Sequence, residues 1–171
     1  FDLTEDQKRI RDAVADFAAS EIAPGTADRE NREIFPAEQL QGLAGMGVLG
    51  MMIPEEYGGS GADALSYILV IEELARVCPS IAVIVSVTNS VFGYPVWKFG
   101  NEEQKKTILR EVASGESLGA YALTEPQSGS DAANQQSVAR LDDRGYVING
   151  RKVWVANAEA ADLLLVFAAT Q

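Results

Sequence analysis

Apolar residues recur every three to four positions through the first two thirds of the chain, which is the spacing of one buried helix face. Two capping boxes, Thr4 with Gln7 and Asn101 with Gln104, are typical of helix starts. The pattern predicts five helices, at residues 4–22, 36 to about 46, 64–77, 80–99 and 101–115.

Two of these helices carry further detail. The segment 80–99 is apolar on nearly every side, so we expect it to be the central helix of a bundle. The second helix has Pro36 in its first turn, where proline is well tolerated. Leu40, Leu43 and Met46 are expected on the buried side of that helix.

Beyond residue 116 the pattern changes to that of strands. Asn149 and Gly150 together favour a tight hairpin turn. Helices followed by strands indicate an α+β chain with segregated domains, here residues 1–115 and 116–171. The predicted strands are 118–123, 137–141, 146–148, 151–155 and a buried, continuously apolar strand at 163–168.

The composition narrows the function classes. The 171 residues include 25 acidic and 14 basic ones, a net charge of −11, which argues against nucleic acid or an anionic membrane as a partner. Histidine is absent and Cys78 is the single cysteine, so the usual general base and metal ligands are missing and no metal site is predicted. The sequence contains no uncharged apolar run of 18 residues, so it predicts no membrane span.

The most informative segment is a polar turn with a large aromatic residue downstream. Thr124, Ser128 and Ser130 supply hydroxyl groups, and Gly129 lets the backbone approach a ligand closely. The N–H groups of such a turn can converge on an anion. Trp154 adds a flat apolar surface with one polar edge. The combination suits a planar cofactor that carries phosphates, although such turns are also common without any ligand.

Several motifs resemble the acyl-CoA dehydrogenase family, in the same order and over essentially the whole chain. The flavin-loop signature is matched by residues 122–126 (Ala-Leu-Thr-Glu-Pro) with 129–131 (Gly-Ser-Asp). Residues 87–90 (Val-Thr-Asn-Ser) and 166–170 favour short-chain members. Further similar segments are residues 1–7, 54–61 and 98–105.

The resemblance implies a fold and an activity. It implies an N-terminal helical bundle followed by the beginning of an antiparallel β-barrel domain, with the family's C-terminal four-helix domain absent from this chain. It further implies FAD as cofactor, α,β-dehydrogenation of a short or short-branched acyl-CoA, electron-transfer flavoprotein as acceptor, and a homotetramer. Bacterial cytoplasm or the mitochondrial matrix would suit such an oxidoreductase of fatty acid metabolism. Neither end resembles a natural terminus, so we expect a longer protein.

The resemblance also assigns residues to the flavin. Leu123 and Thr124 would hydrogen-bond the pyrimidine end of the ring, and Gly129 and Ser130 would reach the pyrophosphate. The Ser130 hydroxyl would also face the substrate's pantetheine arm, and Trp154 would pack beside the ring. The implied cofactor-binding set is Tyr121, Ala122, Leu123, Thr124, Gly129, Ser130, Trp154, Val155 and Ala156.

Two departures leave alternatives open. The family usually has a hydroxyl residue where this chain has Ala156, which removes a side-chain donor near the flavin. The family's catalytic glutamate would lie beyond residue 171, and Glu125 is expected to be structural, so no catalytic residue is assigned. The alternatives are a non-catalytic paralogue or fragment that binds acyl-CoA or protein, and an enoyl-CoA reductase or oxidase on the same fold.

Overall fold

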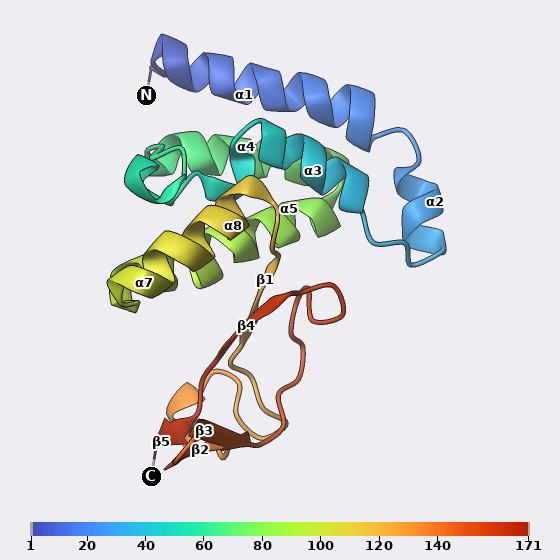
Figure 1. The fold of residues 1–171 in the computed structure, drawn as a ribbon. Helices are drawn as coiled ribbons and strands as arrows, with labels where there is room; N and C mark the ends of the chain where they lie inside the picture. Colours follow the sequence, from blue (N-terminus) through green and yellow to red (C-terminus); the bar gives the residue numbers. More distant parts are fainter. Residues whose placement is uncertain (1, 171) are drawn as a thin grey trace.

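The chain forms a helical domain from which a smaller β region extends (Figure 1). The structure is a computed structural model that describes residues 2–170. The α-helices are α1 (Glu5–Phe17), α2 (Thr26–Asn31), α3 (Ala37–Gly45), α4 (Ala64–Val77), α5 (Pro79–Ser86), α6 (Tyr94–Phe99), α7 (Glu102–Gln104) and α8 (Arg110–Ser114). Wider π-helical turns are η1 (Ala18–Ile22), η4 (Val87–Gly93) and η5 (Lys105–Leu109), and short 3₁₀ turns are η2 (Val48–Gly50), η3 (Glu55–Tyr57) and η6 (Ala132–Asn134).

The helix starts and ends follow their capping chemistry. Both predicted capping boxes are present, because Thr4 accepts from the Gln7 N–H and Asn101 from the Gln104 N–H, with the reciprocal bonds also formed. Asp63 caps α4 by accepting from two backbone N–H groups of its first turn. The last helix ends at Gly115, whose φ of 74° is easily adopted by glycine. The predicted helix at 64–77 is confirmed to the residue.

The central helix runs from residue 79 to 99 as α5, η4 and α6, with a π turn in the middle. Hydroxyls at the turn bond back to carbonyls four residues earlier, Thr88 to Ile84 at 2.8 Å and Ser90 to Ser86 at 2.6 Å. Such bonds compete with the regular helix ladder and accompany its distortion. By length and composition, Pro79–Phe99 could cross a membrane, but its inner residues pack against other helices as in a core helix.

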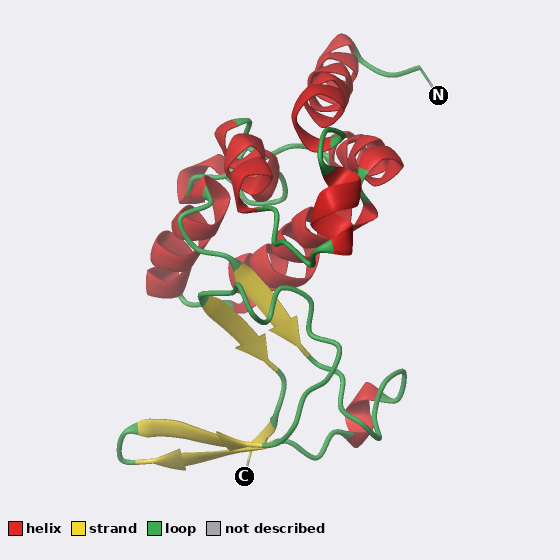
Figure 2. Cartoon of the chain, turned by 90° about the vertical axis from the view of Figure 1, so that its right-hand side faces the viewer, coloured by secondary structure: helices red, strands yellow, loops and turns green. Residues whose placement is uncertain are grey.

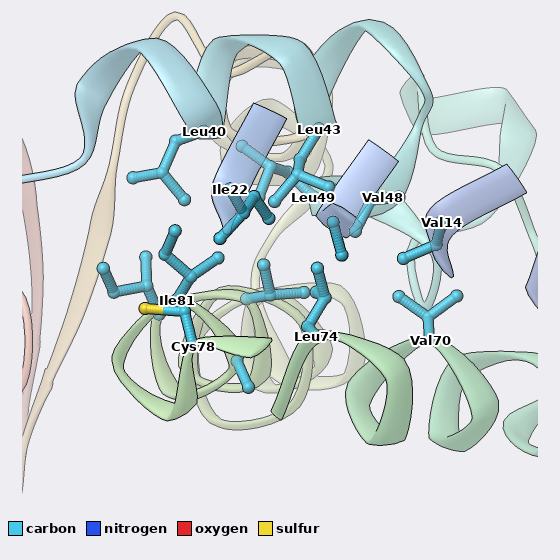
Figure 3. Packing of buried hydrophobic residues seen from close by; sticks show 14 of the residues in the cluster. Val14, Ile22, Leu40, Leu43, Val48, Leu49, Val70, Leu74, Cys78 and Ile81 are labelled. Carbon is cyan, nitrogen blue, oxygen red and sulfur yellow. The ribbon is translucent and has the colours of Figure 1, made fainter. Parts of the chain in front are cut away.

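The main hydrophobic core lies between α1, α3, α4 and α5 (Figure 3). Leu43 on α3 points toward α4, and Leu74 on α4 points toward α3. Both side chains are fully buried. Ile22 enters from the end of the first helix and Ile81 from α5, and both also have no exposed surface. The amphipathic faces predicted from the sequence therefore meet in one cluster, which holds the helical domain together.

Asn89 is a polar residue at the heart of this domain. Its side chain is fully buried on η4 and makes three hydrogen bonds. The amide group donates to the carbonyls of Val48 at 2.9 Å and Val85 at 3.0 Å, and its oxygen accepts the N–H of Met52 at 3.1 Å. Asn89 thus fixes the turn at residues 48–52 to the central helix. The polar groups of Asn89 are therefore used for hydrogen bonds within the fold.

Four details of the helical predictions were wrong. The short helix α2 was not predicted, because six residues give too little periodicity to detect. Met46 is 40% exposed, since α3 ends at Gly45 and Met46 already leaves the helical face. Pro36 lies one position before the helix, as its N-cap. The central helix is also less enclosed than expected, because Val83 on α5 and Phe99 on α6 are exposed.

The β region consists of two small sheets (Figure 2). β1 (Gly119–Ala122) pairs with β4 (Leu163–Val166) in parallel, with Gly119 opposite Leu163. β2 (Val138–Asp142) forms an antiparallel hairpin with β3 (Gly145–Asn149) and pairs in parallel with β5 (Ala169–Thr170). Helices followed by strands are confirmed, and within residues 2–170 the strands form no closed barrel.

Three predictions in the β region were wrong. Asn149 and Gly150 form no hairpin turn, and residues 151–155 form no strand. Gly150 is required for a different reason, because a Cβ atom there would lie 2.0 Å from the Ser137 hydroxyl oxygen. The strand β4 is only partly buried, and its Leu164 is 53% exposed. The hairpin across residues 142–145 is confirmed.

Candidate functional site

The polar turn that follows β1 is braced from within. Glu125 and Ser128 pair through two backbone hydrogen bonds of 2.9 and 3.1 Å, and the Ser128 hydroxyl donates to the Asp131 carbonyl at 2.6 Å. The Ser128 side chain is therefore buried and its hydroxyl is used within the loop, whereas the following residues Gly129 and Ser130 are exposed. The loop therefore buries the side chains of Glu125 and Ser128 and leaves Gly129 and Ser130 accessible to solvent.

A buried ion pair joins this loop to the segment that carries Trp154. The ammonium of Lys152 donates to the Glu125 carboxylate at 2.8 Å and to the Leu123 carbonyl at 2.8 Å. Both charged side chains are nearly inaccessible, at 11% and 2% exposure. The carboxylate also accepts the N–H groups of Gln136 at 2.6 Å and Ser137 at 2.9 Å. A buried carboxylate with this many donors is well compensated for the loss of water.

These contacts hold the carboxyl of Glu125 in its ionised form. The hydrogen bond from Lys152 is the largest cause, and the backbone N–H of Gln136 adds to it, so the pKa of Glu125 lies well below its ordinary value of 4.5. With its oxygens engaged by neighbours, Glu125 is a structural residue, as expected. It is no candidate for a general base.

We expect Glu125 to remain ionised well below pH 4.5, because its pKa in the folded protein is lowered. The stability that this gives is fully present above pH 4.5 and is lost only as the pH falls through the lowered pKa. A ¹³C NMR titration of the side-chain carboxyls, assigned with Glu125→Gln, measures this directly. An inflection of the Glu125 signal near 4.5 would contradict the contacts described above.

Trp154 stands out against the rest of the site in both backbone and exposure. Its φ of 57° lies in the left-handed region, which is rare for a bulky residue and costs conformational energy. Its side chain is 92% exposed. Two neighbouring contacts hold the backbone: the Val153 N–H donates to the Thr124 carbonyl at 2.9 Å, and the Asn157 amide donates to the Gly119 carbonyl at 3.1 Å. An aromatic ring is thus displayed on a fixed backbone.

A large cavity of about 1070 Å³ opens between this segment and the helical domain. One wall is formed by residues 154–160, and the opposite wall by α2, the following residues to Pro36, and the start of α5. Phe35, Val83 and Ile84 give the opposite wall apolar side chains. Its acidic residues include Glu30, whose carboxylate accepts the Ser80 hydroxyl at 2.6 Å. The cavity can accept an apolar group of considerable size.

The predicted site residues fall into two groups. Trp154, Val155 and Ala156 line the cavity. The others lie on β1 and its loop, which are tied to residues 152–153 at the backbone of Leu123 and Thr124. The residues of this second group are Tyr121, Ala122, Leu123, Thr124, Gly129 and Ser130. Tyr121 packs edge-to-face on Phe167 at 5.2 Å between ring centroids, and Ala122 is fully buried.

Lys152 is the site residue that sequence reasoning missed. It was interpreted as part of a strand, and its partner Glu125 is 27 positions away. A single sequence gives no sign that two opposite charges so far apart meet in a buried pair. The one signal was a lysine inside a largely apolar stretch. Within residues 2–170, no group of three metal-binding side chains is present.

The fold consists of a helical domain joined to a β region, with a large cavity between them. Comparison with known families identifies the class of protein to which this arrangement belongs. Residues 4–116 match the family model described as "Acyl-CoA dehydrogenase, N-terminal domain", and residues 120–171 match "Acyl-CoA dehydrogenase, middle domain". The chain belongs to the acyl-CoA dehydrogenase family.

Relatives agree with the family models. The chain is 44% identical to "Acyl-CoA dehydrogenase" of Bacillus subtilis, covering 98% of this chain and 44% of the relative. It is 42% identical to "Acyl-CoA dehydrogenase, short-chain specific" of Clostridium acetobutylicum, covering 99% and 45%. The chain therefore spans less than half the length of these curated relatives.

Solved structures share the fold throughout. A chain from work on the electron transferring flavoprotein of Acidaminococcus fermentans superposes with a TM-score of 0.96 at 41% identity, covering 100% of this chain and 45% of that one. Butyryl-CoA dehydrogenase from Megasphaera elsdenii gives 0.92 at 40%, covering 98% and 45%. An acyl-CoA dehydrogenase complexed with FAD from Bacillus anthracis gives 0.93 at 39%, covering 99% and 29%.

Proposed function

We propose that a full-length protein carrying this chain is an FAD-dependent dehydrogenase of short acyl-CoA thioesters. The observation that carries this proposal is the tie between the β1 loop and residues 152–154. It holds a donor-rich turn close to the segment whose exposed Trp154 lines a large cavity. The relatives support the chemistry, since one is named short-chain specific, one is a butyryl-CoA dehydrogenase, and one was solved with FAD.

The residues present suit a flavin. The N–H of Thr124 donates to no other residue within 2–170, so it is available to a ligand at the loop. A Cβ atom added to Gly129 would meet nothing within 4 Å, which leaves open space for a phosphate to approach the backbone. The exposed ring of Trp154 offers a flat apolar surface for a planar group. We assign the flavin to these three features, with Tyr121, Ala122, Leu123, Ser130, Val155 and Ala156 around it.

Other residues of the chain would serve the substrate. Phe35, Val83 and Ile84 would exclude water from an acyl chain, and the exposed Ser130 would hydrogen-bond the pantetheine arm. A bound flavin would accept the hydride from the β-carbon. Because Glu125 is fully engaged, we place the base that removes the α-proton outside residues 1–171.

The electron acceptor, the oligomeric state and the location are part of the same proposal. A flavoprotein acceptor fits the superposition on a chain from the electron transferring flavoprotein work. A homotetramer is proposed from the family resemblance. A location in bacterial cytoplasm or mitochondrial matrix is proposed because the relatives include bacterial and mitochondrial enzymes.

The proposal is tested by the absorbance spectrum of the purified full-length protein and its anaerobic titration with butyryl-CoA. Flavin bands that bleach on titration are the expected result, because reduction removes the oxidised flavin absorbance. Flavin that does not bleach would favour the enoyl-CoA reductase reading. A colourless protein that cannot be reconstituted with FAD would overturn the proposal and favour a non-catalytic binding protein. The missing hydroxyl at Ala156 would then be consistent with the loss of the flavin.

Gly129→Ala separates a role in the ligand site from a role in the fold. Because the added methyl group meets nothing within 4 Å, we expect the free energy of unfolding to change by less than about 0.5 kcal/mol. If the pyrophosphate lies against this backbone, the methyl group displaces it, and the dissociation constant of FAD should rise about tenfold, or about 1.4 kcal/mol.

The measurement is FAD titration of the apoprotein, followed by protein fluorescence quenching. Gly45→Ala is the matched control, because its added Cβ atom also meets nothing within 4 Å but lies at the end of α3. Equal FAD affinity in the two variants would remove Gly129 from the site.

A further inference from the structure

The Lys152 ammonium occupies a buried position to which the proposed function gives no role. It lies 2.8 Å from the carbonyl oxygen of Leu123, and its side chain is 11% exposed. Lysine is rarely buried in proteins unless it is paired, because removing an ammonium from water is costly. Glu125 at 2.8 Å keeps the charge in place, and the amide oxygen of Gln135 lies at 3.4 Å.

The carbonyl that Lys152 contacts belongs to one particular peptide group. The carbonyl of Leu123 and the N–H of Thr124 are the two ends of the same planar amide. The N–H end donates to no other residue within 2–170, and Thr124 is only half-buried. A cation therefore binds one end of a peptide whose other end is free to donate to a ligand.

A cationic donor on the carbonyl withdraws electron density from the amide. Hydrogen bonds in such a chain polarise one another, so the N–H at the far end becomes a stronger donor. The effect is largest at low exposure, where water screens the charge least. The contact thus changes the electrostatics of the site as well as its shape.

We propose that Lys152 is a positioning residue that strengthens the Thr124 N–H as a donor to the pyrimidine end of the flavin and thereby raises the reduction potential of the bound cofactor. This inference rests on the proposed function. Reduction places additional electron density on the pyrimidine ring, so a stronger donor there favours the reduced state. Glu125 has the opposite influence, because its negative charge offsets that of Lys152.

The ion pair could instead be only a mechanical brace of the loop, and the two roles predict different signs. A brace predicts that removing either partner disturbs the flavin in the same direction. The electrostatic role predicts opposite directions, because Lys152→Met removes the positive charge and Glu125→Gln removes the negative one. The sign comparison therefore decides between the two roles.

The experiment measures the midpoint potential of FAD in the full-length holoprotein by anaerobic reductive titration against a reference dye. For Lys152→Met we expect at least a tenfold loss in the equilibrium constant for two-electron reduction, which corresponds to about 30 mV. For Glu125→Gln we expect a higher potential, because the negative charge that offsets Lys152 is removed. Lys98→Met, an exposed lysine on α6, is the control and should leave the potential unchanged.

Two results would overturn the inference alone. One is a Lys152→Met potential equal to that of Lys98→Met, and the other is a shift of the same sign in Lys152→Met and Glu125→Gln. If Lys152→Met does not fold, Lys152→Gln, which keeps a neutral donor, takes its place in both comparisons. If the unaltered protein binds no FAD, the proposed function itself fails, and this outcome is visible before any variant is made.

Discussion

Leu74→Ala is expected to lower the free energy of unfolding by about 2–5 kcal/mol, the usual range for truncating a fully buried leucine. Leu74 lies on the inner face of α4, where it meets residues of α3 and the end of the first helix (Figure 3). The truncation removes both apolar burial and packing contacts, and the surrounding helices cannot close the cavity completely. Urea unfolding followed by far-ultraviolet circular dichroism measures the change.

Leu65→Ala provides the control on the same helix. Leu65 is 43% exposed, so the same chemical change should alter the free energy of unfolding by about 0.5 kcal/mol or less. Equal losses in the two variants would mean that the burial of Leu74 in the core adds no stability. The pair separates burial from helix propensity, because both substitutions introduce the same residue into one helix.

Asn89→Leu is expected to cost about 2–4 kcal/mol, although leucine is similar in size and more apolar. The substitution leaves the Met52 N–H and the Val48 carbonyl without the partner that Asn89 supplies. Unpaired polar groups inside a protein carry their full desolvation penalty. The same urea unfolding experiment measures the loss.

Thr88→Val is the matched control one residue earlier. Thr88 is also fully buried, but its hydroxyl bonds only to the Ile84 carbonyl within the same helix. We expect a loss of about 1 kcal/mol or less, as for a single local hydrogen bond. If Asn89→Leu is no worse than Thr88→Val, the link between the turn at 48–52 and the central helix contributes little.

The helical domain could be predicted well because its signals are local. Capping residues such as Thr4, Asp63 and Asn101 act within three residues of their own position, so the sequence alone shows them. Gly115 ends the last helix for an equally local reason. The π turn at residues 87–93 was not predicted, because it depends on how Asn89 and its neighbours satisfy their hydrogen bonds in the folded domain.

The β region was harder because its geometry depends on distant contacts. Asn149 with Gly150 is a common turn signal, yet Gly150 is needed for its close approach to Ser137. Trp154 adopts a left-handed conformation that its residue type would not suggest, held by contacts with β1 and its loop. Nothing in residues 151–155 taken alone reveals these partners.

The sequence analysis named the two segments of the candidate site but not the contact that joins them. The family resemblance named the loop and the Trp154 segment, and the structure shows that Lys152 links them. Ion pairs between residues far apart in sequence leave no periodic trace, so neither composition nor spacing could have revealed this one. The roles of the individual residues toward FAD stay predictions until the cofactor experiments are made.

The parallel pairing of β1 with β4 has a consequence for the order of assembly during synthesis. The buried residues of the main core all lie between Val14 and Val85, so they are synthesised before β1 begins. Gly119, by contrast, must wait for Leu163 before its strand has a partner, and closing so long a loop is slow. We expect the helices to form first on the ribosome and the loop after β1 to acquire its shape last.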